Sequence, residues 1–178
     1  MLNSRLKSVY ATEIFKLAEE KENKIFYNSS AEHASIVHQA LAKYATDYID
    51  IFSSSMCTDV SNNPEYCSSI KAFLDADKVH LIKIILTDYT EAFLSTDIAK
   101  LLANYPLQVS IKKYNGRILY KGLPAHFTVS DDRAFRLETD INERMAFGNF
   151  NSPEQAKELK NVFDKIFNST LVKDVCLN

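Results

Sequence analysis

The sequence predicts a single α/β domain in which a mixed, largely parallel sheet is flanked by helices, with an extra N-terminal helix. The length of 178 residues, with 46% hydrophobic and 25% charged residues, suits one domain with a sizeable core. From about residue 24 to 115, strand and helix periodicities alternate, which is typical of strand–helix–strand units with right-handed crossovers. Residues 117–149 show only short strands, and one amphipathic helix follows them. We expect the N-terminal helix in residues 1–23 and the α/β domain in residues 24–178.

The first two thirds of the chain supply the alternating elements. Residues 4–22 carry apolar side chains at helical spacing and a polar opposite face, which predicts the extra helix. Ser29 with Glu32 fits a capping box, and Asn63 followed by Pro64 fits a helix start. The expected strands are 24–28, 47–56, 78–88 and 107–115, and the expected helices are 29–45, 62–77 and 90–106.

The last third of the chain has a different pattern. The segment "VSDDRA" indicates a hairpin with Asp131 and Asp132 at its turn. A final helix at 152–169 begins with Ser152 and Pro153 and has a clear apolar stripe. The short strands are expected at 117–121, 125–130, 133–140 and 144–150.

Composition excludes several function classes. The formal net charge of -2 gives no global preference for nucleic acid or an anionic membrane. The chain has three glycines, at positions 116, 122 and 148. This excludes a dinucleotide-binding G-x-G-x-x-G motif, a P-loop and a G-x-S-x-G nucleophile elbow. We expect no cofactor.

The cysteines and the N-terminal segment indicate a cytoplasmic protein. Cys57, Cys67 and Cys176 are odd in number and lack zinc-site spacing, so we expect reduced thiols. A bridge between Cys57 and Cys67 is the alternative. The first residues lack the long apolar core of a signal peptide, and no run of about 18 apolar residues occurs. We therefore expect no membrane partner.

The order of elements resembles the phospholipase D-like domain superfamily over about residues 24–170. Three strand–helix units, a fourth strand, the hairpin "HFTVSDD" and the closing "FDKIFNS" carry this resemblance. The resemblance implies a catalytic H-x-K-x4-D signature with a downstream G-S-x-N. In that family a histidine attacks phosphorus, a histidine from a second copy of the motif protonates the leaving group, and one-domain members pair two copies. It therefore implies a homodimer.

The catalytic signature is degenerate in this sequence. With Asp131 at the aspartate position, His126 takes the lysine position and Pro124 takes the nucleophile position. Glu138 and Asp140 stand where the phosphate-binding G-S-x-N belongs, and their charges would repel a phosphodiester. If His126 is aligned with the nucleophilic histidine instead, Thr128 stands at the lysine position and Arg133 at the aspartate position. The expected function is therefore a catalytically inactive binding or assembly module, and the alternative is a nuclease or phosphodiesterase with a rearranged site using His126.

The polar residues at the ends of the first strands are candidates for binding a ligand. Ligands of open α/β sheets gather at the carboxyl ends of parallel strands. Those ends are polar here and lead toward helix N-termini that favour a small anion; the alternative is that they only cap helices. These ligand candidates are Tyr27, Asn28, Ser29, Ser53, Ser54 and Ser55.

The most basic stretch of the chain lies between residues 110 and 122. Lys112, Lys113, Arg117 and Lys121 alternate there with tyrosines, a pattern that suits a nucleic-acid strand. The alternative is that the lysines protect an exposed sheet edge from aggregation. The partners expected are thus a second copy or another protein, with nucleic acid as the further option.

The remaining titratable residues do not predict a metal site. His33 and His38 are five residues apart in one helix, so they do not share a face at metal-ligand spacing. For His126 we expect a hydrogen bond to Asp131 or Glu138. The charges around the hairpin indicate cross-strand ion pairs on a solvated surface, with an acidic metal site as the alternative.

Overall fold

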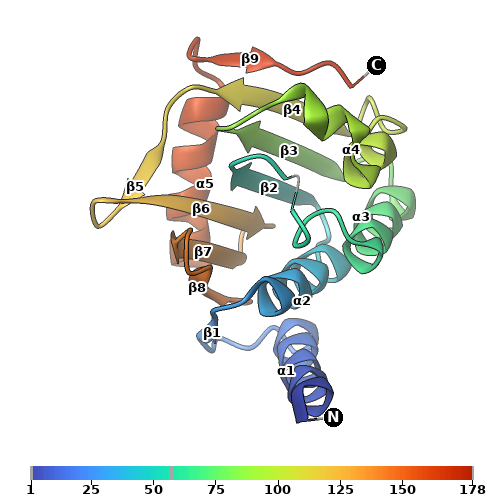
Figure 1. Ribbon diagram of the computed structural model, residues 1–178, viewed down its shortest axis with the longest axis vertical. Coiled ribbons are helices and arrows are strands. Elements are labelled where there is room, and N and C mark those ends of the chain that lie inside the picture. The colour runs from blue at the N-terminus through green and yellow to red at the C-terminus, as the bar shows by residue number, and fades with distance from the viewer. Residues whose placement is uncertain (1, 57, 178) are drawn as a thin grey trace.

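One mixed sheet organises the molecule (Figure 1). The computed structural model describes residues 2–56 and 58–177, with side chains from residue 9 onward. Hydrogen bonds connect the strands in the order β1-β8-β7-β6-β2-β3-β4-β9, and β5 pairs with β6 off this path. The strands are β1 (Phe26–Asn28), β2 (Tyr48–Ser53), β3 (Leu81–Leu86), β4 (Val109–Tyr114), β5 (Ile118–Tyr120), β6 (Leu123–Ser130), β7 (Ala134–Asp140), β8 (Met145–Asn149) and β9 (Val172–Asp174).

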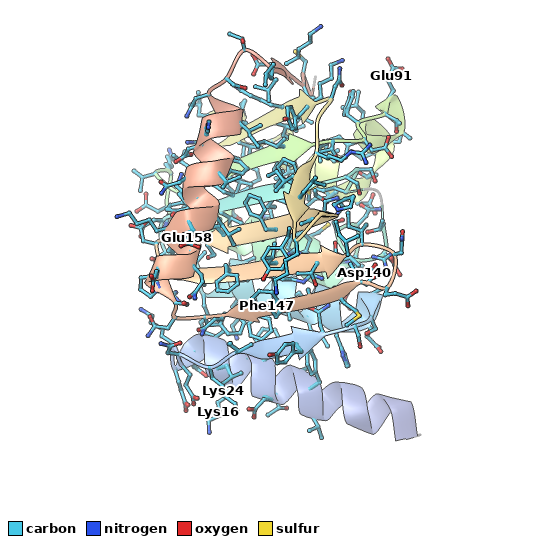
Figure 2. All side chains as sticks on the ribbon, turned by 90° about the vertical axis from the view of Figure 1, so that its left-hand side faces the viewer. Lys16, Lys24, Glu91, Asp140, Phe147 and Glu158 are labelled. Carbon is cyan, nitrogen blue, oxygen red and sulfur yellow. The ribbon has the colours of Figure 1, made fainter. Side chains whose placement is uncertain are left out.

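Helices cover both faces of this sheet. Helices α2 and α3 pack on one face, whereas α5 runs along the other, so the core has two layers of contacts (Figures 1 and 2). Strand β2 shows the division, because Ile49 and Ile51 face α3 while Phe52 packs with Phe163 of α5. The helices are α1 (Leu2–Glu19), α2 (Ala31–Lys43), α3 (Pro64–Ala76), the 3-10 helix η1 (Glu91–Ser95), α4 (Asp97–Leu102) and α5 (Pro153–Phe167).

Aromatic packing fixes α5 to its face of the sheet. The rings of Phe52 and Phe127 stack at 5.5 Å, and Phe127 meets Phe163 edge to face at 6.4 Å. Full burial of such a side chain contributes about 1.5–3 kcal/mol. The apolar stripe predicted for this helix is thus largely buried, although Val162 remains 39% exposed.

The centre of the sheet agrees with the predicted parallel units. Strands β2, β3 and β4 are parallel neighbours, with Ile51 beside Ile84 and Ile84 beside Ile111. The other strand pairs are antiparallel, so the sheet is mixed, and the expectation that it is largely parallel was wrong.

The repeated strand–helix pattern suggests that the first strand lies next to the second, but in the structure the two are not neighbours. Strand β1 pairs antiparallel with β8 at the edge of the sheet, with Phe26 opposite Gly148. A Cβ at Gly148 would lie 2.5 Å from the Phe26 ring and 2.3 Å from the carbonyl oxygen of Phe135. The absence of a side chain there lets Phe26 close over the sheet, and the chain crosses the whole of β8, β7 and β6 before β2 begins.

The helix starts are partly as predicted. Asn63 accepts from the Tyr66 backbone N–H at 2.9 Å, which confirms its capping role ahead of Pro64. The cap of α2 is Ser30, not Ser29, since the Ser30 hydroxyl accepts from the His33 backbone N–H at 3.1 Å.

Two other helix predictions need adjustment. The helix expected at 90–106 is divided at Thr96, whose hydroxyl caps α4 by accepting from Ala99 N. Ser152 precedes α5, but its hydroxyl bonds the Gln155 side chain and not the backbone.

Helix α1 continues away from the body of the domain at its N-terminal end (Figure 2). Its second half is fixed to α2 by the burial of Ile14, Leu17 and Ala18. None of the helices described is long and apolar enough to cross a membrane. Cys67 and Cys176 are free thiols. Cys57 lies outside the described residues, and so does the alternative of a bridge between Cys57 and Cys67.

Candidate functional site

A small polar cavity of about 130 Å³ lies on the face of the sheet that carries α2 and α3, where β2 ends. Strands β2, β6 and β7 form its floor, and the loop after β2 and the β7–β8 turn form its walls. The lining residues are His38, Ile51, Phe52, Ser53, Ser54, Met56, Thr58, Val60, Ser61, Tyr66, His126, Phe127, Thr128, Arg136, Glu138, Ile141 and Arg144.

Strand alternation decides which side chains reach this cavity. On β6, Phe127 belongs to the core beneath α5, so His126 and Thr128 point to the opposite face. On β7 the same alternation directs Arg136 and Glu138 to that face. The register places His126 directly opposite Glu138, which brings the two side chains together across the hairpin.

Glu138 is the centre of a buried ionic network. Its carboxylate oxygens lie 3.1 Å from His126 Nδ1 and 3.0 Å from Arg136 Nη2. Only 3% of Arg136, 9% of Glu138 and 9% of His126 is exposed. Burial alone would raise the pKa of Glu138, but the hydrogen bond from His126 and the charge of Arg136 outweigh it and lower that pKa to about 2.

The tautomer of His126 follows from the charge of its partner. An ionised carboxylate accepts hydrogen bonds and cannot donate them. Since Glu138 is ionised at neutral pH, Nδ1 of His126 carries the proton that bridges the two groups. The expected hydrogen bond of His126 to Glu138 is therefore present, and Nδ1 is not free to act as a nucleophile.

A second set of contacts holds Arg136 in place. Its Nε donates to Asn28 Oδ1 at 3.0 Å, and Asn28 Nδ2 donates to the carbonyl oxygen of Arg144 at 3.1 Å. Strand β1 thus connects the network to the β7–β8 turn, where Arg144 has a left-handed backbone with φ 53°. The Arg144 guanidinium, which lines the cavity, lies 3.5 Å from the exposed carboxylate of Asp59.

His38 is a member of this site that the sequence did not indicate. Its ring packs edge to face on Tyr66 at 5.7 Å and lines the cavity. Burial, followed by the positive charge of Arg136, lowers the pKa of His38 to about 3. The imidazole is consequently neutral at pH 7 and offers hydrogen bonding without charge.

The arrangement can be compared with known structures. No protein-family model and no curated protein sequence matches the chain. The chain is similar to Nuc from Salmonella typhimurium, described as a phospholipase D family member, at 13% identity and a TM-score of 0.53, over 85% of this chain and 96% of that one. It is also similar to NucT from Helicobacter pylori at 15% identity and a TM-score of 0.56, over 86% and 99% of the two chains. The chain has the phospholipase D-like fold.

A third similar structure includes the N-terminal helix. TrmBL2, described as an archaeal chromatin protein with a novel mode of DNA binding, matches at 10% identity and a TM-score of 0.63. The match covers 98% of this chain, and this chain spans 63% of TrmBL2, less than two thirds of its length. The structural likeness to TrmBL2 therefore extends over almost all of the chain, whereas the likeness to Nuc and NucT covers 85% and 86% of it.

Asp131 does not take part in the His126 network of this phospholipase D-like domain. It is buried at the β6–β7 turn, in a left-handed backbone with φ 54°. Its carboxylate accepts from the backbone N–H groups of Thr46 and Asp47 at 3.1 and 3.0 Å. Asp131 therefore anchors the chain that enters β2. The interpretation of the hairpin charges as solvated was wrong for Asp131, Arg136 and Glu138.

The ligand candidates at the strand ends do not form one site. Ser53 and Ser54 line the cavity, and Ser55 is half-buried in the loop that follows. Asn28 reaches the network through Arg136. Tyr27 is 71% exposed and, like Ser29, faces solvent, because β1 lies at the sheet edge and not beside β2.

The basic stretch is divided by the same alternation. Lys112 lies on the α5 side, where it donates to the carbonyl oxygen of Phe167 at 3.0 Å and lies over that ring. Lys113 points to the other face and lies over the ring of Tyr89. Arg117 and Lys121 are exposed on the hairpin that contains β5, so they are the cations of this stretch that remain accessible to a partner.

The described part of the chain does not bring metal-ligating side chains together. The described His, Cys, Asp and Glu side chains form no cluster of three or more that could hold a metal ion. The acidic residues near the hairpin have separate partners: Asp131 anchors the start of β2, Glu138 belongs to the buried network, and Asp140 accepts from the backbone of the β7–β8 turn.

Proposed function

We propose that this phospholipase D-like domain is a binding module that does not cleave phosphodiesters. The observation that carries the proposal is the burial of His126 in the network with Glu138 and Arg136, which leaves 9% of the residue exposed to a substrate. Pro124, at the position that corresponds to the nucleophile when Asp131 anchors the motif, has no nucleophilic side-chain atom. The residues that would form and hold a phosphohistidine are thus replaced.

The charge of the cavity supports the same conclusion. A phosphoryl group develops negative charge during transfer and requires cations directed at it. Here the ionised Glu138 occupies the centre of the floor and is paired with Arg136. Glu138 therefore already neutralises the buried cation beside His126, and this pairing withholds it from a phosphodiester held there.

The alternative is a rearranged phosphodiesterase in which Nε2 of His126 attacks phosphorus. Glu138 would then orient the imidazole, as a carboxylate orients the histidine of a catalytic triad. The two functions differ in one measurable property. We expect no hydrolysis of bis(p-nitrophenyl) phosphate or single-stranded DNA above a buffer blank, for the wild type and for His126→Ala alike. Turnover by the wild type that His126→Ala abolishes would overturn the proposal.

Nucleic acid is the partner class that a specific observation favours. TrmBL2, which shares the fold over 98% of this chain, is described as binding DNA. Arg117 and Lys121 present accessible charge on the β5 hairpin, and Tyr120 lies beneath Lys121 at 5.3 Å from its Nζ. An aromatic ring next to cations suits a nucleic-acid strand.

The nucleic-acid proposal is tested by fluorescence anisotropy with labelled DNA over a salt series. We expect affinity to fall steeply with salt and to drop in the double variant Arg117→Gln, Lys121→Gln. The matched control is Lys16→Gln with Lys157→Gln, which removes the same charge from exposed positions of α1 and α5. The absence of binding at low salt, or equal loss in both double variants, would remove this proposal.

We also propose that the chain forms a homodimer, which rests on the pairing of one-domain members of the phospholipase D-like superfamily. Light scattering coupled to size-exclusion chromatography measures the mass directly. A mass near twice 20.3 kDa supports the dimer, and a mass near 20.3 kDa at micromolar concentration contradicts it.

A further inference from the structure

The cavity beneath α2 and α3 has an excess of positive charge. The guanidinium groups of Arg136 and Arg144 both line it, whereas Glu138 is the acidic residue of the lining. His38 is neutral at pH 7, because its pKa is about 3. Asp59, which approaches Arg144 at 3.5 Å, is not a lining residue, and its side chain is 71% exposed. Its charge is therefore screened by water more than those inside.

The two guanidinium groups repel each other. Burial is the main cause of the lowered pKa of Arg136, Glu138 opposes it, and the charge of Arg144 adds a smaller lowering. A single negative charge placed near both groups would relieve this repulsion. The Arg144 side chain is 35% exposed, so an anion entering from solvent reaches it first.

Hydroxyl groups share the cavity with these charges. Ser53 and Ser54 come from the end of β2, Thr128 from β6, and Thr58 and Ser61 from the loop above. Hydroxyls donate and accept, so they match the hydroxyls of a ligand. The volume of about 130 Å³ suits a small molecule and not a polymer.

We propose that this cavity binds a small hydroxy carboxylic acid, with its carboxylate at Arg144 and its hydroxyls against the serine and threonine side chains. A carboxylate carries one charge and matches the fork of a guanidinium. A phosphate monoester carries a charge of about -1.5 to -2 at neutral pH, more than the lining balances. A neutral polyol would leave the arginine repulsion in place. The inference rests on the proposed function, because it requires a site that binds without cleavage.

The experiment compares ligands that differ only in charge. D-Glycerate and D-gluconate are titrated into the full chain by isothermal calorimetry, next to glycerol and D-sorbitol, their neutral counterparts, and inorganic phosphate. We expect one or both acids to bind more tightly than the matching polyol and than phosphate. Equal binding of acid and polyol, tighter binding of phosphate, or no binding of either acid would overturn the inference.

Variants place the ligand in the cavity. Arg144→Gln is expected to weaken acid binding about tenfold or more, since it removes a charged hydrogen-bond donor, while Arg144→Lys restores part of it. Asp59→Asn removes the competing carboxylate and is expected to retain or tighten binding. Arg117→Gln, an exposed arginine outside the cavity, is the matched control with unchanged binding. Arg144→Gln keeps the backbone carbonyl that Asn28 uses, and circular dichroism checks that it is folded. Unchanged affinity in folded Arg144→Gln would contradict the inference.

The two proposals fail in different ways. Hydrolysis of a phosphodiester by the wild type would overturn the binding-only function whatever the acids do. Absence of both hydrolysis and acid binding would overturn this inference alone.

Discussion

Arg136 and Glu138 lie two residues apart on the same strand, and Nη2 of the first is 3.0 Å from a carboxylate oxygen of the second. Both side chains are withdrawn from solvent on the α2 face of the sheet. Ion pairs at such depth are costly to desolvate and depend on both partners. This pair, with His126 beside it, therefore decides the stability of the hairpin and the chemistry available in the cavity.

Removal of the Glu138 charge is expected to destabilise the fold strongly. Glu138→Gln leaves the Arg136 guanidinium buried without a counter-ion, which costs about 3–5 kcal/mol of unfolding free energy. Glu158→Gln on the exposed side of α5 is the control, with an expected change within about 0.5 kcal/mol. Urea denaturation of the three proteins measures both values. Equal stabilities for the two variants would show that the network contributes little.

Acid is expected to destabilise the domain in two stages. The pKa of His38 is lowered from 6.5 to about 3, so the unfolded chain binds a proton that the folded chain rejects, and stability falls as pH drops below 6.5. The pKa of Glu138 is lowered from 4.5 to about 2, so its contribution is complete above pH 4.5 and is lost as pH falls toward 2.

The variant His38→Gln separates these stages. Between pH 6.5 and 4.5 the His38 contribution is up to about 1.4 kcal/mol per pH unit. We expect a smaller pH slope of the unfolding free energy in this window for the variant than for the wild type, measured by urea denaturation at four pH values. Identical slopes would mean that His38 does not couple folding to protons.

The Asp131 anchor is expected to matter far more than its neighbour. Asp131→Ala leaves the N–H groups of Thr46 and Asp47 without their acceptor and places alanine at φ 54°. The expected loss is about 2–4 kcal/mol. Asp132 accepts one exposed hydrogen bond, from the Tyr48 hydroxyl at 2.9 Å, so Asp132→Ala is expected to cost about 0.5–1 kcal/mol. Thermal unfolding ranks the two, and a larger loss for Asp132→Ala would contradict the assignment.

Local sequence patterns predicted the fold class because its central units are local. Strands β2, β3 and β4 with their helices follow one another in the chain, and β-branched runs such as Leu81–Leu86 are typical of buried parallel strands. Strand β1 has three residues, and its partner lies about 120 residues away in the sequence. Periodicity gives the face of a strand and contains no information on its neighbour, so the position of β1 could not be predicted.

The candidate site could be predicted only in part for a related reason. Alternation and the two-aspartate turn limited the partner of His126 to Asp131 or Glu138, and the strand register selects Glu138. The sequence pattern did not predict that this face of the hairpin is buried, because its burial depends on how α2 and the loop after β2 cover it. His38 was compared with His33 on its own helix, whereas it lies on the wall of a cavity formed by three strands. Side chains that meet through tertiary packing leave no spacing in the sequence.

The binding-only claim is tested most directly by a search for the phosphohistidine itself. The protein is mixed with bis(p-nitrophenyl) phosphate, whose p-nitrophenolate is a good leaving group, quenched in alkaline denaturant over times from milliseconds to minutes, and examined by intact mass spectrometry. We predict an unchanged mass at every time, because His126 is buried and Pro124 stands at the position of the nucleophile. A phosphoryl adduct that forms on the wild type and disappears in His126→Ala would contradict this account.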